Sequence, residues 1–304
     1  MKIDRRKLLH GVGAAGAISL MPGFVSAAAA ATPDLSVITG SDPAKNVKAA
    51  VDALGGIERF VSKGDKVVIK PNLGFGNPSS KATTTEPAIV KAVAEMALNA
   101  GAKRVMVFDN PCHKADIVLK VTGMKKELSK LDDTFVYIIK DDKFFKQIEL
   151  PKSKSLKKTE MSIDLLDADT IIAIPVAKSH GATKVSFTMK GWMGVVKSRI
   201  PWHTYLDIHQ AIADISLFVK PKLTILDATR ALVTGGPGGP GKIEHLKTIV
   251  AGTDPVAVDS YGVTLAPWGG KGYKPEEITF ILKAVQHGVG RMDIQNMNIL
   301  KKTA

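Results

Sequence analysis

The apolar residues of the chain fall into short continuous runs that alternate with longer segments of helical spacing. The runs have the length of strands and few polar positions, which is typical of strands covered on both faces. They predict six strands, at residues 66–73, 104–110, 134–140, 170–178, 222–228 and 248–254.

Amphipathic helices are predicted between these strands. Their ranges are residues 43–60, 86–101, 204–219, 255–266 and 275–288. The second begins at Glu86-Pro87 and ends at Gly101, which are typical start and stop signals. Because strand–helix–strand units build parallel pairs, we expect an α/β protein, a layered α/β/α fold with a mostly parallel central sheet. Residues 32–304 are expected to form one such domain, with residues 123–158 as a lysine-rich insertion.

The first 31 residues differ from the rest in composition. A basic start is followed by a Gly/Ala-rich, modestly apolar stretch and by small residues at 27–31. This pattern predicts a secretory signal peptide, and the pair Arg5-Arg6 resembles a twin-arginine signal. An ordinary secretory signal and an uncleaved anchor are the alternatives. We expect a periplasmic or otherwise exported protein that uses the twin-arginine export machinery, with no transmembrane segment in the mature chain.

The formal net charge of +13 limits the partners. Much of the excess lies between Lys120 and Lys158, where arginine and aromatic residues are not interleaved as in nucleic-acid-binding surfaces. A solvated lysine-rich face is therefore favoured, with no nucleic acid as partner. An anionic small molecule fits the charge as well.

Cys112 is the only cysteine, which excludes an intramolecular disulfide. It also excludes a cysteine-ligated iron–sulfur cluster, since such a cluster needs about four thiolates.

Charged or amide side chains follow five of the apolar runs. One of these groups alone would be explained as a turn or a helix cap. In a parallel sheet, however, all carboxyl ends lie on one edge, and ligands bind in the crevice beyond them. We therefore expect a site at this edge. The residues at the ends of the runs are Lys70, Asn72, Asp109, Lys178, His180, Asp227 and Asp254.

The segment of residues 178–198 contains no acid and carries Lys178, His180 and Lys190, followed by Gly191. Its cations can hold an anion, and small residues let the backbone approach a ligand. His203 lies four residues before Asp207 and would share a helical face with it if one helix included both.

A divalent metal would draw on a set of acids and histidines from which Asp227 and His203 are the preferred ligands, although the spacing matches no tight metal motif. The other members of the set are Asp109, His180, His209 and Asp254. The Gly/Pro loop at 234–242 includes Gly235 and Gly236. It resembles a phosphate cradle in glycine content but lacks the Lys-Ser/Thr ending of a Walker motif.

Several of these stretches together resemble the domain-of-unknown-function 362 family. They are "VVIKPNL", "GAKRVMVFDN", "IIAIPVAKSHGATKVSFTMKGWMGVV", "LTILDA", "GGPGGPGK" and "AGTDPVAVDSYG", in that order. The resemblance implies an α/β domain and no established reaction. Some relatives carry ferredoxin-like cysteine motifs, which this chain lacks, and many have Lys-Asn in place of Lys190-Gly191.

The pattern favours an enzyme that acts on an anionic small molecule, with His180 as general acid or base because an unperturbed imidazole titrates near neutrality. The alternatives are an exported ligand-, metal- or cofactor-binding protein without turnover, and an accessory protein whose strand-end polar groups are turns and caps. The candidate catalytic residues are His180, Lys178 and Asp109. The candidate ligand-binding residues are Lys70, Asn72, Lys190, Gly191, Gly235 and Gly236. The candidate metal ligands are Asp227 and His203.

Overall fold

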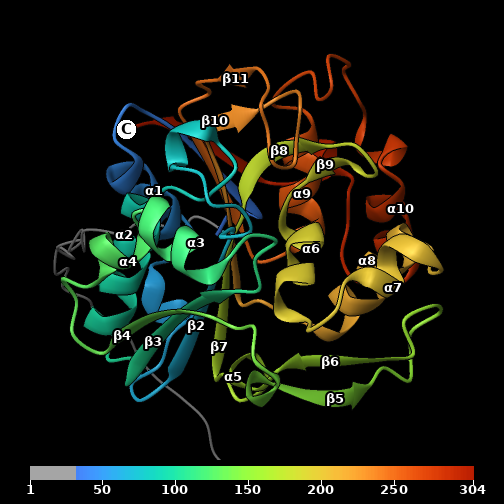
Figure 1. Cartoon of the computed structure of the whole chain (residues 1–304). Coiled ribbons are helices and arrows are strands. Elements are labelled where there is room, and N and C mark those ends of the chain that lie inside the picture. The colour runs from blue at the N-terminus through green and yellow to red at the C-terminus, as the bar shows by residue number, and fades with distance from the viewer. Residues whose placement is uncertain (1–31) are drawn as a thin grey trace, which may run out of the picture. The chain divides into compact units, whose positions relative to one another are not determined.

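A central sheet with helices on both faces makes up the described part of the chain (Figure 1). The computed structural model describes residues 32–304, so the predicted signal peptide lies outside the described residues. The predicted α/β class and its mostly parallel sheet are confirmed. Within residues 32–304, none of the helices combines the length and the apolar character needed to cross a bilayer.

Eight strands form the main path of the sheet, in the order β13-β1-β12-β10-β7-β2-β3-β4. The block β10-β7-β2-β3-β4 is parallel throughout. Their bounds are β1 Leu35–Thr39, β2 Lys66–Pro71, β3 Arg104–Asp109, β4 Thr134–Ile138, β7 Thr170–Ile174, β10 Leu223–Leu232, β12 Thr248–Gly252 and β13 Ile299–Thr303. The six predicted strands thus all contribute to the sheet, whereas β1 and β13 were not predicted.

One predicted strand runs in the opposite direction from the parallel block. β12 pairs antiparallel with β10, so its carboxyl end lies at the other edge of the sheet. Asp254, which follows β12, therefore does not join the other strand-end residues, and this part of the expectation is wrong. Its carboxylate instead caps α9 (Pro255–Val263), accepting hydrogen bonds from the backbone N–H groups of Val256 and Ala257.

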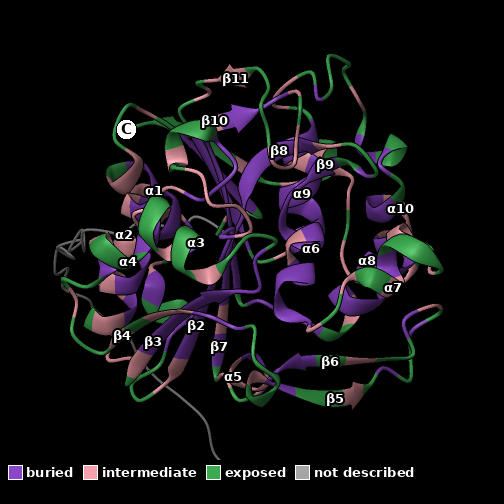
Figure 2. Ribbon diagram, viewed as in Figure 1, coloured by how far each residue is buried: buried purple, intermediate pink, exposed green. Residues whose placement is uncertain are grey.

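Two hydrophobic cores cover the two faces of the sheet. On one face, alternate strand residues such as Val67 and Ile69 pack with α1 (Pro43–Ala53) and α2 (Pro87–Asn99). On the other, Val68 packs in a core that includes α8 (Ile208–Phe218), α9 and α10 (Thr279–Gln286). The two helical layers flank the sheet in Figure 1, and their sheet-facing sides are buried in Figure 2. Strands covered on both faces explain the continuous apolar runs of the sequence.

The predicted strand at 170–178 is two strands. β7 ends at Ile174, and after Pro175 the chain continues as β8 (Val176–His180), which forms an antiparallel hairpin with β9 (Lys184–Ser186). β8 remains paired with β10, including Val176 opposite Asp227. The hairpin thus extends beyond the end of β7 and carries Lys178 and His180 with it.

Short elements complete the fold. The predicted helix at 204–219 begins only after Asp207, which caps α8, and His203 belongs to the separate α7 (Ile200–Thr204). His203 and Asp207 therefore do not share a helix. The lysine-rich range 123–158 contains α4, the edge strand β4 of the main sheet and β5, and it ends where β6 begins. The other elements are α3 Ala115–Val121, α4 Met124–Leu128, β5 Phe145–Glu149, β6 Lys158–Ser162, α5 Ile163–Leu166, α6 Thr188–Gly191 and β11 Ile243–Glu244.

Candidate functional site

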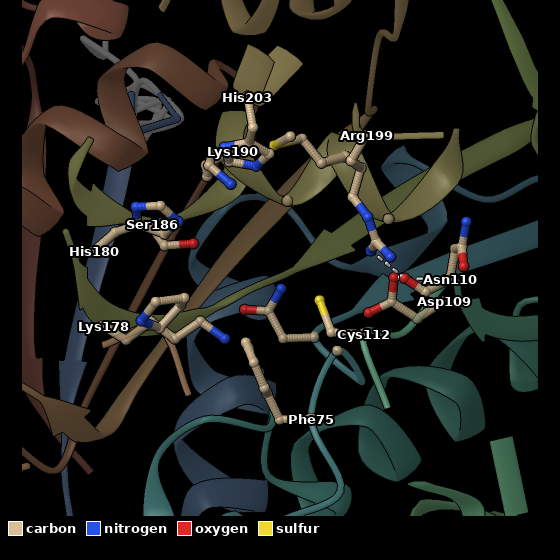
Figure 3. A pocket seen from close by; sticks show the side chains of 16 residues that line it. Phe75, Asp109, Asn110, Cys112, Lys178, His180, Ser186, Lys190, Arg199 and His203 are labelled. Atoms are coloured by element: carbon tan, nitrogen blue, oxygen red, sulfur yellow. Dashed lines mark hydrogen bonds between the residues drawn. The ribbon is translucent and has the colours of Figure 1, made fainter. Parts of the chain in front are cut away.

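A cavity of about 390 Å³ opens beyond the carboxyl ends of the parallel strands, as the edge rule for such sheets predicts (Figure 3). Its walls come from segments far apart in the sequence: the ends of β2 and β3, the β8–β9 hairpin, α6, and the stretch leading into α7. Its charged and polar lining residues are Asn72, Asp109, Asn110, Cys112, Lys178, His180, Ser186, Lys190, Arg199 and His203.

A buried ion pair lies at the Asp109 side of the cavity. The Nζ atom of Lys70 lies 3.0 Å from Oδ1 of Asp109, with the two side chains only 2% and 4% exposed. The other oxygen, Oδ2, accepts a hydrogen bond of 2.7 Å from the backbone N–H of Leu73. Burial lowers the pKa of Lys70, while the adjacent carboxylate opposes that shift. Both Asp109 oxygens are thus engaged within the protein, and Lys70 neutralises the charge.

Gly194 makes room for this pair. A Cβ atom at that position would collide with Oδ1 of Asp109 and lie 2.9 Å from Nζ of Lys70. The backbone of Gly194 also accepts a hydrogen bond of 2.9 Å from the N–H of Asn110. A residue without a side chain is therefore required for the backbone to close over the ion pair.

Lys178 projects from β8 into the cavity and is 3% exposed. Its Nζ donates a hydrogen bond of 2.7 Å to the carbonyl of Thr83 and lies 5.2 Å from the centroid of the Phe75 ring. Burial lowers its pKa to about 7, and nearby Lys190 and Lys70 add to this effect, while Asp109 opposes it. Lys178 therefore exists as both amine and ammonium near neutral pH.

Lys190 is a buried cation without a counter-ion. It lies on α6, is 8% exposed, and its ammonium has no hydrogen-bond or ion-pair partner among residues 32–304. Burial lowers its pKa to about 8, and Arg199 contributes in the same direction. The start of α6 is fixed by the buried carboxylate of Asp259, which accepts hydrogen bonds from the N–H groups of Thr188 and Met189. Because an unpaired buried charge is costly, an anion bound in the cavity would stabilise the charged form of Lys190.

His180 is held neutral. Its Nδ1 accepts hydrogen bonds from the N–H groups of Ala182, at 3.1 Å, and Thr183, at 3.4 Å. An Nδ1 that accepts must be unprotonated, so the neutral ring carries its proton on Nε2. Burial lowers the pKa of His180 to about 3, and Lys190 and His203 add to the shift. The expectation that this histidine titrates near neutrality does not fit its surroundings. It is a hydrogen-bond donor at neutral pH.

Arg199 is a lining residue that the sequence analysis did not single out. Its guanidinium donates to the carbonyls of Asn110, at 2.5 Å, and Pro111, at 3.2 Å, and so joins α7 to the end of β3. His203 lines the same side, and burial lowers its pKa, with help from Lys190 and Arg199. The sequence could have indicated Arg199, because the acid-free stretch that begins at Lys178 continues through Arg199 to His203.

The Gly/Pro loop forms part of the cavity wall through Pro237. Gly235 and Gly236, which were predicted to bind ligand, are not lining residues. The N–H of Gly236 donates a hydrogen bond of 3.0 Å to Oγ of Ser179, and a Cβ at Gly236 would collide with the Ser179 carbonyl. These glycines therefore let the loop pack against β8, while Gly191 does line the cavity.

The two predicted metal ligands do not meet. His203 lines the cavity, whereas Asp227 is buried outside it. The carboxylate of Asp227 accepts hydrogen bonds from the N–H of Glu86 and from the N–H and hydroxyl of Thr229. Within residues 32–304 no group of three or more His, Cys, Asp or Glu side chains is arranged to hold a metal ion. Asp227 instead ties the start of α2 to β10.

Solved structures also resemble this chain. The lactate racemase apoprotein of Thermoanaerobacterium thermosaccharolyticum superimposes with a TM-score of 0.50 and 12% identity, over 75% of this chain and 57% of that one. A protein of Thermotoga maritima gives a TM-score of 0.40 at 13% identity, over 61% of this chain and 51% of that one. The match spans little more than half of either structure, and the first shows a shared α/β fold.

Among proteins compared by sequence, a thylakoid-associated protein of Synechocystis sp. is 28% identical over 223 residues, which are 70% of this chain and 67% of that protein. Residues 67–264 match the family described as "Domain of unknown function (DUF362)". This range holds the strand ends, the hairpin, α6 and α7, and therefore every wall of the cavity. The chain belongs to the DUF362 family.

Proposed function

We propose that this protein is an enzyme that acts on a small organic anion bound in the cavity at the carboxyl ends of the parallel strands. The observation that carries the proposal is the charge of the lining. Lys178, Lys190 and Arg199 face the cavity, and Asp109, the one acid among the residues of 32–304 that line it, is already paired with Lys70. A desolvated site with excess positive charge favours a carboxylate or a phosphate.

Lys190 and Arg199 are the proposed anion-holding groups, with His203 beside them. The unpaired ammonium of Lys190 gains a counter-ion when the ligand binds, and a charge-assisted hydrogen bond contributes about 1.5–3 kcal/mol. Asn72 is already oriented for a supporting role. Its Oδ1 accepts a hydrogen bond of 3.0 Å from the N–H of Val176, which leaves its amide NH₂ as a donor at the cavity wall.

Lys178 is the proposed reactive group. A group whose pKa lies near the working pH exchanges protons most efficiently, and the pKa of Lys178 is about 7. His180 keeps the role of a positioned donor, since its Nε2–H remains protonated across the neutral range. Asp109 supports the site by holding Lys70 and the start of the loop after β2.

Calorimetric titration tests the anion site with inorganic phosphate, citrate and 2-oxoglutarate as probes. Lys190→Gln is expected to weaken binding roughly tenfold or more, since one charge-assisted hydrogen bond is lost. Lys184→Gln, an exposed lysine of β9 that does not line the cavity, is the control and should bind as the wild type does. Equal affinity of Lys190→Gln and wild type for every probe would contradict the proposed site.

Turnover is tested separately by incorporation of solvent deuterium into bound 2-oxoglutarate, followed by NMR. We expect exchange with the wild type and none with Lys178→Met. Binding without exchange on any of the probes would favour the second candidate, an exported ligand-binding protein without catalysis, which would need the same unpaired cation.

We also propose that the protein acts outside the cytoplasm, on the strength of the twin-arginine-like sequence around Arg5-Arg6. Replacing both arginines by lysine should retain the protein in the cytoplasmic fraction of cells that otherwise export it. Export that continues unchanged would argue for an ordinary secretory signal.

A further inference from the structure

The β8–β9 hairpin gathers three reactive or polar groups on one face. Lys178 and His180 are two residues apart on β8, so their side chains point to the same side. Ser186 on β9 is the register partner of Lys178, and directly opposed residues of an antiparallel pair also share a face. All three line the cavity, and Figure 3 shows them together on one side of it.

Two neutral donors lie on the same hairpin face as Lys178. His180 presents Nε2–H, because its Nδ1 is occupied by backbone N–H groups. Ser186 is 6% exposed, and its hydroxyl has no hydrogen-bond partner among residues 32–304. Lys178 itself donates a hydrogen bond to the Thr83 carbonyl, which orients its Nζ atom. When Nζ is unprotonated, this hydrogen bond does not use the lone pair of the nitrogen.

Cations line a further part of the cavity wall. Lys190 and Arg199, with His203, come from α6 and the stretch leading into α7 (Figure 3). A ligand with a carboxylate toward Lys190 would therefore present its other end to an amine flanked by two donors. A carbonyl group fits that end, because its oxygen accepts from the donors while its carbon faces the nucleophile.

We propose that Lys178 forms a covalent imine with the carbonyl carbon of a small oxo acid, a molecule that carries a carboxylate and a ketone or aldehyde. This inference rests on the proposed anion site and names its substrate class. Burial and the neighbouring cations keep a share of Lys178 unprotonated near neutral pH, which a nucleophilic amine requires.

The step balances without an oxidant or a reductant. The nitrogen lone pair forms the C–N bond as the carbonyl C=O π bond breaks, and the oxygen takes up a proton. The resulting carbinolamine loses its hydroxyl oxygen as water when the C=N bond forms. The two hydrogens of the original amine leave the nitrogen in the course of the reaction and are balanced by the water released. Ser186 and the Nε2–H of His180 stabilise the oxygen while it carries charge.

Trapping with cyanoborohydride tests the imine in the full-length protein, with pyruvate and 2-oxoglutarate as probes. Reduction of the C=N bond fixes the adduct, and peptide mass mapping locates it. We expect an adduct on Lys178 of the wild type, its loss in Lys178→Arg, which keeps the charge, and its retention in Lys184→Arg. Thermal melting of each variant shows whether it is folded.

The outcomes separate the two proposals. If 2-oxoglutarate binds by calorimetry but no adduct forms on Lys178, or the adduct lies on Lys190, the imine is overturned and the anion site stands. If neither pyruvate, 2-oxoglutarate nor inorganic phosphate binds, the anion site fails and the imine fails with it.

Discussion

Replacing Asp109 by alanine is expected to destabilise the protein rather than simply to remove a catalytic group. The change leaves the Lys70 ammonium buried at 2% exposure, with the Pro71 carbonyl as its remaining acceptor at 2.6 Å. Breaking one partner of a buried ion pair costs about 3–5 kcal/mol of unfolding free energy. The backbone N–H of Leu73 also loses its acceptor. Because Lys70 can lose its proton, we expect a loss near the lower end of this range.

Chemical denaturation at pH 7, followed by circular dichroism, measures the effect. Asp109→Ala should lower the free energy of unfolding by about 3 kcal/mol. The double variant Lys70→Met/Asp109→Ala should be more stable than Asp109→Ala alone, since no unpaired charge remains. Asp142→Ala is the control, because its pair with Lys197 leaves Asp142 85% exposed, and it should not shift the midpoint. An unchanged midpoint for Asp109→Ala, combined with lost turnover, would refute the reasoning and restore Asp109 as a catalytic residue.

Three further predictions follow from the same geometry. Since the pKa of Lys178 falls to about 7, the unfolded chain binds a proton that the folded chain lacks between pH 7 and about 10. The contribution of Lys178 to the free energy of unfolding therefore increases with pH across this range. Lys178→Met, which lacks the titratable group, should melt at a higher temperature than the wild type at the lower end of the range, and this difference should shrink as the pH rises. A difference in melting temperature that stays constant with pH would contradict the prediction. Gly194→Ala should lower stability by about 1–3 kcal/mol and weaken phosphate binding, because its Cβ displaces the buried ion pair. Gly181→Ala, with open space around it, is the control for denaturation. Asp254→Ala should lower the free energy of unfolding by about 1–2 kcal/mol, because a helix cap is lost. The variant should keep its affinity for phosphate, since Asp254 lies at the other edge of the sheet. A loss of phosphate affinity would contradict the placement of Asp254 outside the site.

The sequence predicted the strands of the parallel block because each is buried on both faces and therefore apolar throughout. Val67 and Val68 belong to different cores, yet they look alike in the sequence. The direction of a strand, in contrast, does not change its pattern of apolar residues. The apolar run at 248–252 is equally compatible with either direction, so only the pairing of β12 with β10 shows that Asp254 faces away.

The candidate site was predicted in part. Lys178, His180 and Lys190 do line one cavity, because they follow a buried run at the carboxyl edge. What each group does depends on neighbours that are distant in sequence. The pairing of Asp109 with Lys70 and the backbone donors on His180 Nδ1 are fixed by tertiary packing, and no local pattern encodes them. Arg199 was missed because it follows no strand.

The position of β1 has a consequence for how the protein is made. β1 lies between β12 and β13, with Leu35 opposite both Gly252 and Ile299. An early segment of the nascent chain thus has no neighbours to pair with until far later residues leave the ribosome, and contacts of such long sequence separation form slowly. Until then its edges are open to chaperones or to mispairing. Under the export in the folded state that we propose above, β1 would have to be inserted into the sheet before transport.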